Sequence, residues 1–230
     1  MDWNDVAKLD DIWLNFGGRG NCHPLPSYEN YVSVDLEPPS AGWSVKHDLR
    51  DPIPLADGSV SRILTEHFVE HIKLEEISRL LIECYRLLKP GGHMRIACPD
   101  YSNPRDRRAF DGCEHDKRNP LHITRTDYHM IRKLIESSPF DDFYFFHYWD
   151  GDKFIQRNFD HSLGPIKRTP ENDSRCRQDN VFRKVRTFFS DQIFKLTRSG
   201  NYTDVEFLSR RGHRLYITSL VVDLYKRGFN

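Results

Sequence analysis

The stretch IWLNFGGRG at residues 12–20 is a short apolar run that stops at a cluster of glycines. An apolar run of this length, bounded by glycine, indicates a buried strand that ends in a tight loop. Because glycine has no side chain, the backbone N–H groups of such a loop can approach a ligand closely. This stretch therefore predicts the first strand of a sheet, followed by a loop suited to ligand binding.

Apolar periodicity predicts further strands and a helix before residue 100. Residues 72–88 carry apolar side chains at spacings of three and four with charged residues between them, which indicates an amphipathic helix. The sequence KPGG at residues 89–92 then supplies helix-stop signals. The strands are expected at residues 31–36, 44–49, 62–68 and 93–98. Strands that alternate with helices imply an α/β fold with a mainly parallel, doubly wound sheet.

The second half of the chain is less regular. Its expected elements are a helix at residues 126–137 and strands at residues 143–149 and 216–225. Between the last two strands lies a long polar stretch without clear periodicity, and such stretches are usually functional or disordered. We expect a single domain over the whole chain, with a core at about 12–150 and 214–228 and an insertion or cap at about 151–213.

Composition excludes several classes of protein. Lys and Arg number 34, as do Asp and Glu, so the chain lacks the basic excess of a nucleic-acid-binding protein. The five cysteines are an odd number without metal-ligand spacing, which fits a reducing cytoplasm and predicts no metal site. The first residues are acidic rather than apolar, and no apolar run reaches the ~18 residues of a membrane span. We therefore expect a cytoplasmic protein that binds no nucleic acid and has no membrane span.

Polar residues follow the predicted strands at the points where the strands end. In an open parallel sheet, ligands bind beyond the carboxyl ends of the strands. The segments concerned are Asp35, residues 47–49, residues 65–67 and residues 99–100. Each of these segments alone is more often a turn or a cap. Their occurrence together, in order along the chain, favours a binding site. A dinucleotide dehydrogenase is disfavoured, because GGRG is not GxGxxG and Pro24 and Pro26 leave little room for its first helix.

Four segments in order carry a family resemblance: LNFGGRGN, YVSVDL, HDLRDPIPLADGSVSRILTEHFVEHI and LLKPGGHMRIACPD. This order resembles the class I S-adenosylmethionine-dependent methyltransferases, and especially a compact subgroup from bacterial and large-virus glycan biosynthesis. The similarity covers residues 12–100, and the closing TSLVVDLYK is similar to the last strand of the subgroup. The resemblance implies a Rossmann-like, seven-stranded, mostly parallel sheet with one antiparallel strand and helices on both faces.

The resemblance also implies where S-adenosyl-L-methionine contacts the chain. The implied cofactor-binding residues are Asn15, Gly17, Gly18, Gly20, Asp35, Leu36, Asp48, Leu49, Glu66 and His67. The first four would flank the methionine part, Asp35 would hold the ribose, and the last two would border the transferable methyl group. Two positions depart from the family pattern: Asn15 stands where most members have an acid, and Arg19 stands where a second glycine is usual.

Methyl transfer from a sulfonium is an in-line displacement, and a hydroxyl acceptor must also lose its proton. A general base is thus needed for an alcohol but not for a thiolate or an amine. The candidate bases are His67, His71, Asp100, His115 and His122. His67 is preferred because it ends the fourth strand, beside the position that the resemblance gives to the methyl group. Histidines in such loops also occur without a catalytic role, so the other candidates stay open.

The subgroup implies an O-methyltransferase that acts on a sugar hydroxyl of a glycan or nucleotide-sugar. Between residues 153 and 214, basic residues outnumber acidic ones about two to one, which suits a phosphate-bearing acceptor but also a solvated surface. Aromatic residues at 143–149 suit sugar stacking, although core positions are more common for them. The alternatives are a methyltransferase for a small metabolite or a protein side chain, and a cofactor-binding module without catalysis.

Overall fold

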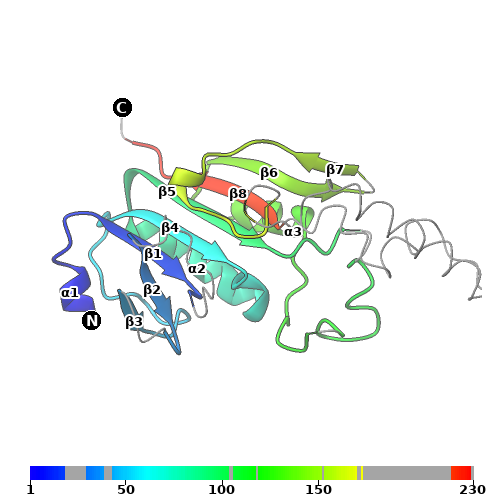
Figure 1. Ribbon diagram of the computed structural model, residues 1–230, viewed down its shortest axis with the longest axis horizontal. Helices are drawn as coiled ribbons and strands as arrows, with labels where there is room; N and C mark the ends of the chain where they lie inside the picture. The colour runs from blue at the N-terminus through cyan, green and yellow to red at the C-terminus, as the bar shows by residue number, and fades with distance from the viewer. Residues whose placement is uncertain are drawn as a thin grey trace, which may run out of the picture.

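The computed structural model describes residues 1–18, 30–38, 43–103, 106–117, 119–151, 153–169, 172 and 219–228. Its strands form one eight-stranded sheet in the order β3-β2-β1-β4-β5-β8-β6-β7 (Figure 1). The strands are β1 (Ile12–Phe16), β2 (Val32–Asp35), β3 (Ser44–Lys46), β4 (Val60–Glu66), β5 (Leu88–Cys98), β6 (Asp142–Asp150), β7 (Lys153–Gln156) and β8 (Leu220–Tyr225). The helices and 3₁₀ turns are α1 (Trp3–Val6), η2 (Val69–His71), α2 (Leu74–Leu87), α3 (Tyr128–Glu136) and η3 (His161–Leu163).

The sheet is mostly parallel, as the sequence predicts. Strands β1 to β5 pair in parallel with their neighbours, and β8 pairs antiparallel with both β5 and β6. The difference from the expected seven strands is β7, which forms an antiparallel hairpin with β6. Gly151 stands in the turn of this hairpin with φ 60°, a left-handed conformation that glycine adopts without strain. Two strands, β7 and β8, therefore oppose the rest instead of one.

Most predicted elements lie within two residues of the observed ones. The largest shift concerns residues 89–92, which the sequence marks as a helix stop and which the structure includes in β5. The backbone N–H of Gly91 donates to the Lys226 carbonyl at 2.7 Å, and the N–H of Lys226 donates to the Gly92 carbonyl at 3.0 Å. The helix still ends at Leu87, so the stop signal is correct and the strand begins directly after it. The predicted last strand is described only from Leu220, because residues 211–218 lie outside the described part.

One face of the sheet is apolar and is covered by α2 and α3. In Figure 1, α2 lies behind the strands. The apolar residues of α2 recur at spacings of three and four, so they form one stripe that faces the sheet. The core on this side contains, from the strands, Leu14, Phe16, Val34, Ile63, Met94 and Ile96, and from the helices Ile77, Leu81, Cys84, Ile131 and Ile135. No helix among the described residues is long and apolar enough to cross a membrane.

The opposite face carries a buried ion pair between neighbouring strands. Arg95 on β5 stands directly opposite Asp223 on β8. Its Nε and Nη2 donate to the two carboxylate oxygens of Asp223 at 2.6 and 2.7 Å, and both side chains are almost fully buried. The remaining nitrogen, Nη1, donates to the carbonyl oxygens of Asp160, at 2.8 Å, and Gly164. A bidentate guanidinium can be buried in this way because each of its three nitrogens donates a hydrogen bond.

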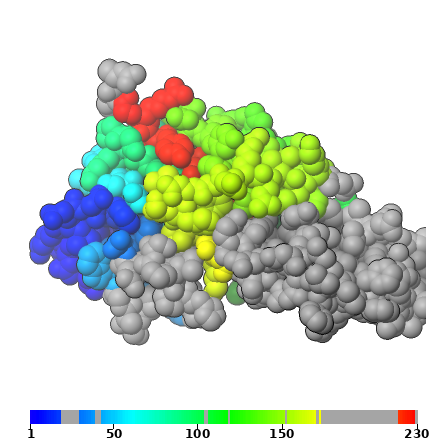
Figure 2. All heavy atoms as spheres, turned by 45° about the horizontal axis from the view of Figure 1, so that its top comes forward, coloured from blue at the N-terminus to red at the C-terminus, as the bar shows by residue number. Residues whose placement is uncertain are grey.

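The segment at residues 157–169 covers this second face. Figure 2 shows it in yellow-green between the N-terminal strands in blue and β8 in red. Ile166 packs with Tyr31, Leu64 and Val221, and the Tyr31 hydroxyl donates to the Leu163 carbonyl at 3.1 Å. Among the described residues, this face is thus covered by an extended segment with η3 rather than by helices as expected. The division into a core and an insertion stays a prediction.

We predict that Asp223→Asn lowers the free energy of unfolding by about 3–5 kcal/mol, because it leaves a buried guanidinium without its counter-charge. Burial opposes ionisation of Asp223, but the hydrogen bonds from Arg95 and His93 and their charges outweigh it, so the pKa of Asp223 lies below its ordinary value. Its stabilising contribution is thus complete above pH ~4 and is lost as the pH falls through the folded-state pKa.

Urea unfolding at neutral pH measures the effect of Asp223→Asn. The matched control is Asp141→Asn, which removes an exposed carboxylate 3.7 Å from Arg227. An exposed pair of this kind contributes at most about 1 kcal/mol. Equal losses in the two variants would show that burial of Arg95 does not depend on Asp223.

Candidate active site

The carboxyl ends of the central strands bring the predicted site residues to one edge of the sheet. Phe16, the last residue of β1, pairs with Val34 on one side and with Thr65 on the other. The glycine turn after β1, Asp35 at the end of β2 and His67 after β4 therefore lie at neighbouring strand ends. This is the edge at which open parallel sheets bind ligands.

The two described glycines of the turn pack against the chain itself. Gly17 has φ 69°, and its N–H donates to the Val34 carbonyl at 2.9 Å. A Cβ on Gly17 would lie 2.7 Å from Cβ of Phe68, and a side chain on Gly18 would collide with the Ser33 hydroxyl. The protein therefore requires glycine at both positions even without a ligand. The third predicted glycine, Gly20, lies outside the described residues together with Arg19.

Polar groups beside this turn are available to a ligand. Asn15 is 5% exposed, and its amide nitrogen lies beside Gly18. The hydroxyl of Ser33 is buried and has no hydrogen-bond partner among the described residues. Asp35 is half-buried, with one carboxylate oxygen accepting the Glu37 N–H at 2.9 Å. Buried polar atoms are usually paired, so the Ser33 hydroxyl points to a partner that the described residues do not supply.

Three other residues that were predicted to contact the cofactor make contacts with other parts of the chain. The Asp48 carboxylate accepts hydrogen bonds from the Arg50 guanidinium at 2.5 and 2.9 Å, and these bonds lower the pKa of Asp48 to about 2. Leu49 belongs to the apolar core. Glu66 accepts the backbone N–H of Lys167 at 2.7 Å, so it ties β4 to the segment that covers the second face. Leu36, the residue after Asp35, is in contrast 52% exposed.

His67 lies between a carboxylate and a hydroxyl. Its Nδ1 is 3.1 Å from Oε1 of Glu70, and its Nε2 is 2.8 Å from Oγ of Ser219. The residue has φ 56°, a left-handed conformation that is costly for a side chain with a Cβ. Burial opposes ionisation of Glu70, but the hydrogen bond from His67 and its charge outweigh it, so the pKa of Glu70 lies below its ordinary value.

Two more of the candidate bases gather around Glu70. The His71 and His122 rings meet edge to face with centroids 4.8 Å apart, and Nε2 of His122 is 3.9 Å from Oε1 of Glu70. The Tyr101 hydroxyl lies between Nδ1 of His122, at 2.6 Å, and the Asp116 carboxylate, at 2.9 Å. Burial lowers the pKa of His122 below its ordinary value. Three predicted histidines thus form one group, which we call the Glu70 cluster: His67, Glu70, His71 and His122.

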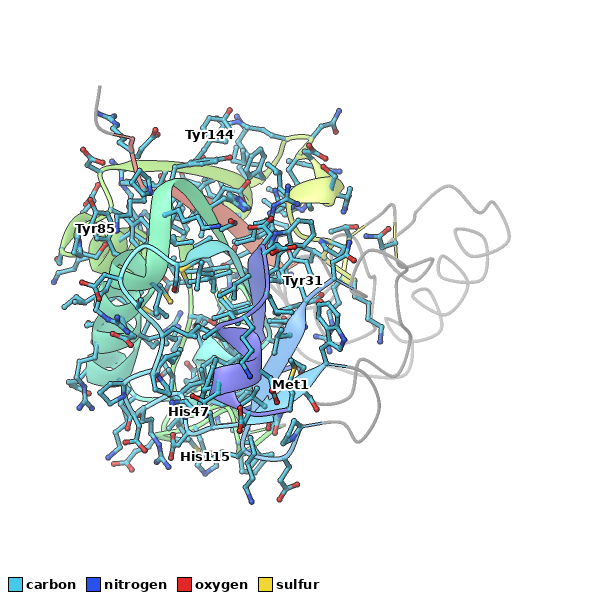
Figure 3. All side chains as sticks on the ribbon, turned by 90° about the vertical axis from the view of Figure 1, so that its left-hand side faces the viewer. Met1, Tyr31, His47, Tyr85, His115 and Tyr144 are labelled. Atoms are coloured by element: carbon cyan, nitrogen blue, oxygen red, sulfur yellow. The ribbon has the colours of Figure 1, made fainter. Side chains whose placement is uncertain are left out.

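The remaining two candidates have other partners. The carboxylate oxygens of Asp100 accept the backbone N–H groups of Ser102 at 3.0 Å and Trp149 at 2.7 Å, so Asp100 joins the end of β5 to β6. Nδ1 of His115 is 3.2 Å from the Asp116 carbonyl. Figure 3 shows His115 at the opposite end of the view from Tyr144 on β6. Asp100 therefore has a structural role, and His115 contacts backbone.

Sequence reasoning missed three residues that build this site: Glu70, Tyr101 and Ser219. Glu70 follows His67 by three residues, which is the spacing of facing side chains in a helical turn, so a signal existed. Ser219 reaches His67 only because β8 enters the sheet beside β5, and no local pattern indicates that contact.

Part of the chain is similar to known proteins. Residues 17–96 match a family described as a methyltransferase domain. A probable S-adenosylmethionine-dependent methyltransferase of Mycolicibacterium smegmatis is 26% identical over 97 residues, or 42% of this chain. The matched part of this chain is thus similar to methyltransferase domains. The match takes in 35% of the Mycolicibacterium protein, so it spans about a third of that relative.

Solved methyltransferase structures are similar to this chain, and the first of them shows the same fold. A crystal structure of an S-adenosylmethionine-dependent methyltransferase from Archaeoglobus fulgidus superimposes with a TM-score of 0.53 and 17% identity, over 98% of this chain and 90% of that one. Phosphoethanolamine N-methyltransferase 2 of Haemonchus contortus, solved with S-adenosylhomocysteine, has a TM-score of 0.48 and 14% identity, over 99% of this chain and 53% of that one.

The strand ends of the sheet fit S-adenosylmethionine, the methyl donor of the proteins that this chain resembles. The cofactor presents ribose hydroxyls, which need hydrogen-bond acceptors, and an amino-acid part, which needs polar partners. Asp35 offers a carboxylate at the end of β2, and the turn after β1 is lined by the buried Asn15 amide and by the Ser33 hydroxyl, which has no partner among the described residues. The assignment of individual contacts stays a prediction.

We predict that Asp35→Ala weakens binding of S-adenosylhomocysteine by about 5- to 150-fold, because ribose hydroxyls would lose their acceptor (about 1–3 kcal/mol). Isothermal titration calorimetry measures the dissociation constant. Asp51→Ala is the matched control, since it removes an exposed carboxylate after β3. An unchanged dissociation constant for Asp35→Ala would remove this residue from the site.

We predict that Asp100→Asn is less stable than wild type by about 1–3 kcal/mol at pH 5, because one backbone N–H faces an amide that cannot accept from it. Burial raises the pKa of Asp100 to about 7. The folded state thus holds the proton of Asp100 more tightly than the unfolded chain does. The stability that Asp100 contributes therefore falls as the pH rises from about 4 to about 7.

The stability difference between wild type and Asp100→Asn should therefore shrink across that pH range, as measured by urea unfolding. Asp111→Asn, at an exposed position, should show no such trend. If the difference stays constant with pH, Asp100 is already ionised in the folded protein at pH 5.

Proposed function

We propose that this chain methylates the oxygen of a sugar hydroxyl, in a glycan or a nucleotide-sugar, with S-adenosylmethionine as the methyl donor. The observation that carries the proposal is the position of His67, held between the Glu70 carboxylate and the Ser219 hydroxyl at the carboxyl end of β4. Such an arrangement suits an alcohol acceptor, because only an alcohol needs its proton removed during transfer.

The hydrogen bonds of His67 define the nitrogen that would accept the proton. The ionised Glu70 carboxylate can only accept, so Nδ1 of His67 donates to it, and in the neutral imidazole Nε2 then holds the lone pair. That lone pair already faces a hydroxyl group, the side chain of Ser219 at 2.8 Å. An acceptor hydroxyl that takes the place of Ser219, or bonds to it, would pass its proton to the same nitrogen. Glu70 then stabilises the imidazolium that forms.

The cofactor, when bound, supplies an electrophilic methyl group on a sulfonium. The residues of this chain would hold it through Asn15, Gly18 and Asp35, beside the turn after β1. Phe68 packs on Gly17 and fixes the turn relative to His67. In-line transfer needs the acceptor oxygen about 3 Å from the methyl group, so this rigid connection between the two sites matters.

Support for a sugar acceptor comes from the resemblance to the glycan-biosynthesis subgroup and from the basic excess after residue 153. The aromatic residues of β6 give little support for stacking on a sugar, because several of them are buried. Phe145, His147 and Trp149 are buried, whereas Tyr144 is 48% exposed with the Arg157 guanidinium 5.0 Å from its ring. The alternatives, a small metabolite, a protein side chain or a module without catalysis, are outcomes of the test below.

We also propose that the protein works in the cytoplasm. The described cysteines Cys84, Cys98 and Cys113 are free thiols, and the first two are buried. Burial raises the pKa of Cys84, so its thiol stays protonated and unreactive. Free thiols in a chain of this length suit a reducing compartment.

We predict that His67→Ala lowers methyl transfer at least ~10²-fold while S-adenosylhomocysteine still binds, because general-base assistance typically contributes 10²- to 10⁴-fold. Mass spectrometry for added methyl groups, on a panel of glycans, nucleotide-sugars and small metabolites, identifies the acceptor and then measures the rate. The control is His115→Ala, since Nδ1 of His115 lies 3.2 Å from a backbone carbonyl, that of Asp116.

Near-normal turnover of His67→Ala would assign the base elsewhere. An acceptor that is an amine would overturn O-methylation. If wild-type protein binds S-adenosylhomocysteine but methylates nothing in the panel, the chain is a binding module.

A further inference from the structure

The Glu70 cluster contains three groups that can bind a metal ion. Glu70, His71 and His122 each bring one ligand atom to a place where all three atoms lie within 4.8 Å of one another. The Glu70 side chain is fully buried, while the two histidines are partly exposed. Two imidazoles and one carboxylate are a ligand set used by divalent transition metals, zinc among them.

One oxygen of Glu70 has no partner in the part of the chain that the structure describes. Oε1 takes the hydrogen bond from His67 at 3.1 Å. Oε2 is buried and has no hydrogen-bond partner among the described residues. A buried carboxylate oxygen without a donor or a cation costs free energy, since it has lost its water and gained nothing in exchange. This oxygen therefore points to a ligand that the described residues do not provide.

Outer hydrogen bonds fix the proton of each imidazole on the nitrogen that faces away from the cluster. Nδ1 of His71 is 2.9 Å from the Leu121 carbonyl, which can only accept. The single proton of the Tyr101 hydroxyl goes to the Asp116 carboxylate, so this hydroxyl accepts from Nδ1 of His122. Both histidines thus hold their lone pair on Nε2. Metal-binding histidines are commonly held in this way, with the other nitrogen donating to a carbonyl or to a polar side chain.

The backbone around the three groups is tightly connected. The Glu70 carbonyl accepts the N–H groups of Ile123 and Thr124 at 2.9 and 3.1 Å. The Thr124 hydroxyl donates to the Ile72 carbonyl at 2.5 Å. These bonds join η2, which carries Glu70 and His71, to the loop that carries His122. Ligands on two segments that are fixed to each other need little reorganisation to bind an ion.

We propose that Glu70, His71 and His122 form a binding site for one divalent transition-metal ion of the zinc class. The ion would accept the lone pairs of both Nε2 atoms and of Oε2 of Glu70. Ligand atoms around a tetrahedral zinc lie roughly 3.4 Å apart, so the side chains would move inward by about an ångström. Three protein ligands leave a coordination position for water or another oxygen, as in catalytic rather than structural zinc sites.

The test uses Co²⁺, whose visible absorption reports its coordination, on the full-length protein after removal of metals with a chelator. We expect one equivalent of Co²⁺ to produce visible absorption bands, and Zn²⁺ to displace it. His122→Ala should weaken Co²⁺ binding by roughly 100-fold or more. Tyr101→Phe should weaken it by about 10- to 100-fold, because it removes only the outer hydrogen bond of His122.

The matched control is His129→Ala. His129 is exposed, and its Nε2 lies 3.9 Å from Asp150, a single carboxylate at the surface. This variant should bind Co²⁺ as wild type does. Circular dichroism checks that each variant folds. If His122→Ala does not fold, Tyr101→Phe still tests the site. Absence of stoichiometric binding, or equal binding by Tyr101→Phe and wild type, would overturn the proposal.

The metal site and the proposed function can fail separately. Co²⁺ absorption requires neither the cofactor nor an acceptor, so it measures the site without methyl transfer. Variants of His122 and Tyr101 are preferred to variants of Glu70, because Glu70 also bonds to His67. Metal binding without any methylated product would establish the metal site and contradict the proposed function. Methyl transfer without metal binding would support the proposed function and contradict the metal site.

Discussion

The buried pair of Arg95 and Asp223 is the constraint on which the rest of the structure depends. A guanidinium inside a protein needs hydrogen-bond acceptors and a balanced charge, and here one neighbouring carboxylate and two carbonyls supply them. The carboxylate fixes β8 against β5, and the carbonyls of Asp160 and Gly164 bring the covering segment onto the sheet. Because β8 begins beside the end of β5, the same arrangement carries Ser219 to His67.

The sequence predicts those parts of the fold that local periodicity determines. β1 was placed at its observed bounds, and α2 within two residues, because one is an apolar run ended by glycine and the other a regular amphipathic stripe. β7 was missed because KFIQ is too short to show alternation in a polar stretch. At the site, strand-end reasoning placed Asp35 and His67 at neighbouring strand ends, where the structure has them, and their roles stay predictions. It could not foresee that Asp100 accepts the backbone N–H of Trp149 on another strand, and a catalytic role for Asp100 stays a prediction too.

Two buried carboxylates near the strand ends show how environment decides the role of an acid. Burial acts in the same direction on both, against ionisation. Asp100 receives its hydrogen bonds from neutral backbone groups, and its pKa rises to about 7. Glu70 bonds to an imidazole that can carry a positive charge, and its pKa falls. The first therefore serves to join two strands, while the second remains an anion surrounded by nitrogen atoms.

The position of β8 has a consequence for how the protein is made. This strand follows the seven other described strands in the chain, yet it stands inside the sheet, hydrogen-bonded to β5 on one side and β6 on the other. Until residues 220–225 emerge from the ribosome, β5 and β6 each present an unpaired edge, and the two parts of the sheet cannot join. Such edges invite pairing with other chains. The eight-stranded sheet forms only after residues 220–225 have left the ribosome.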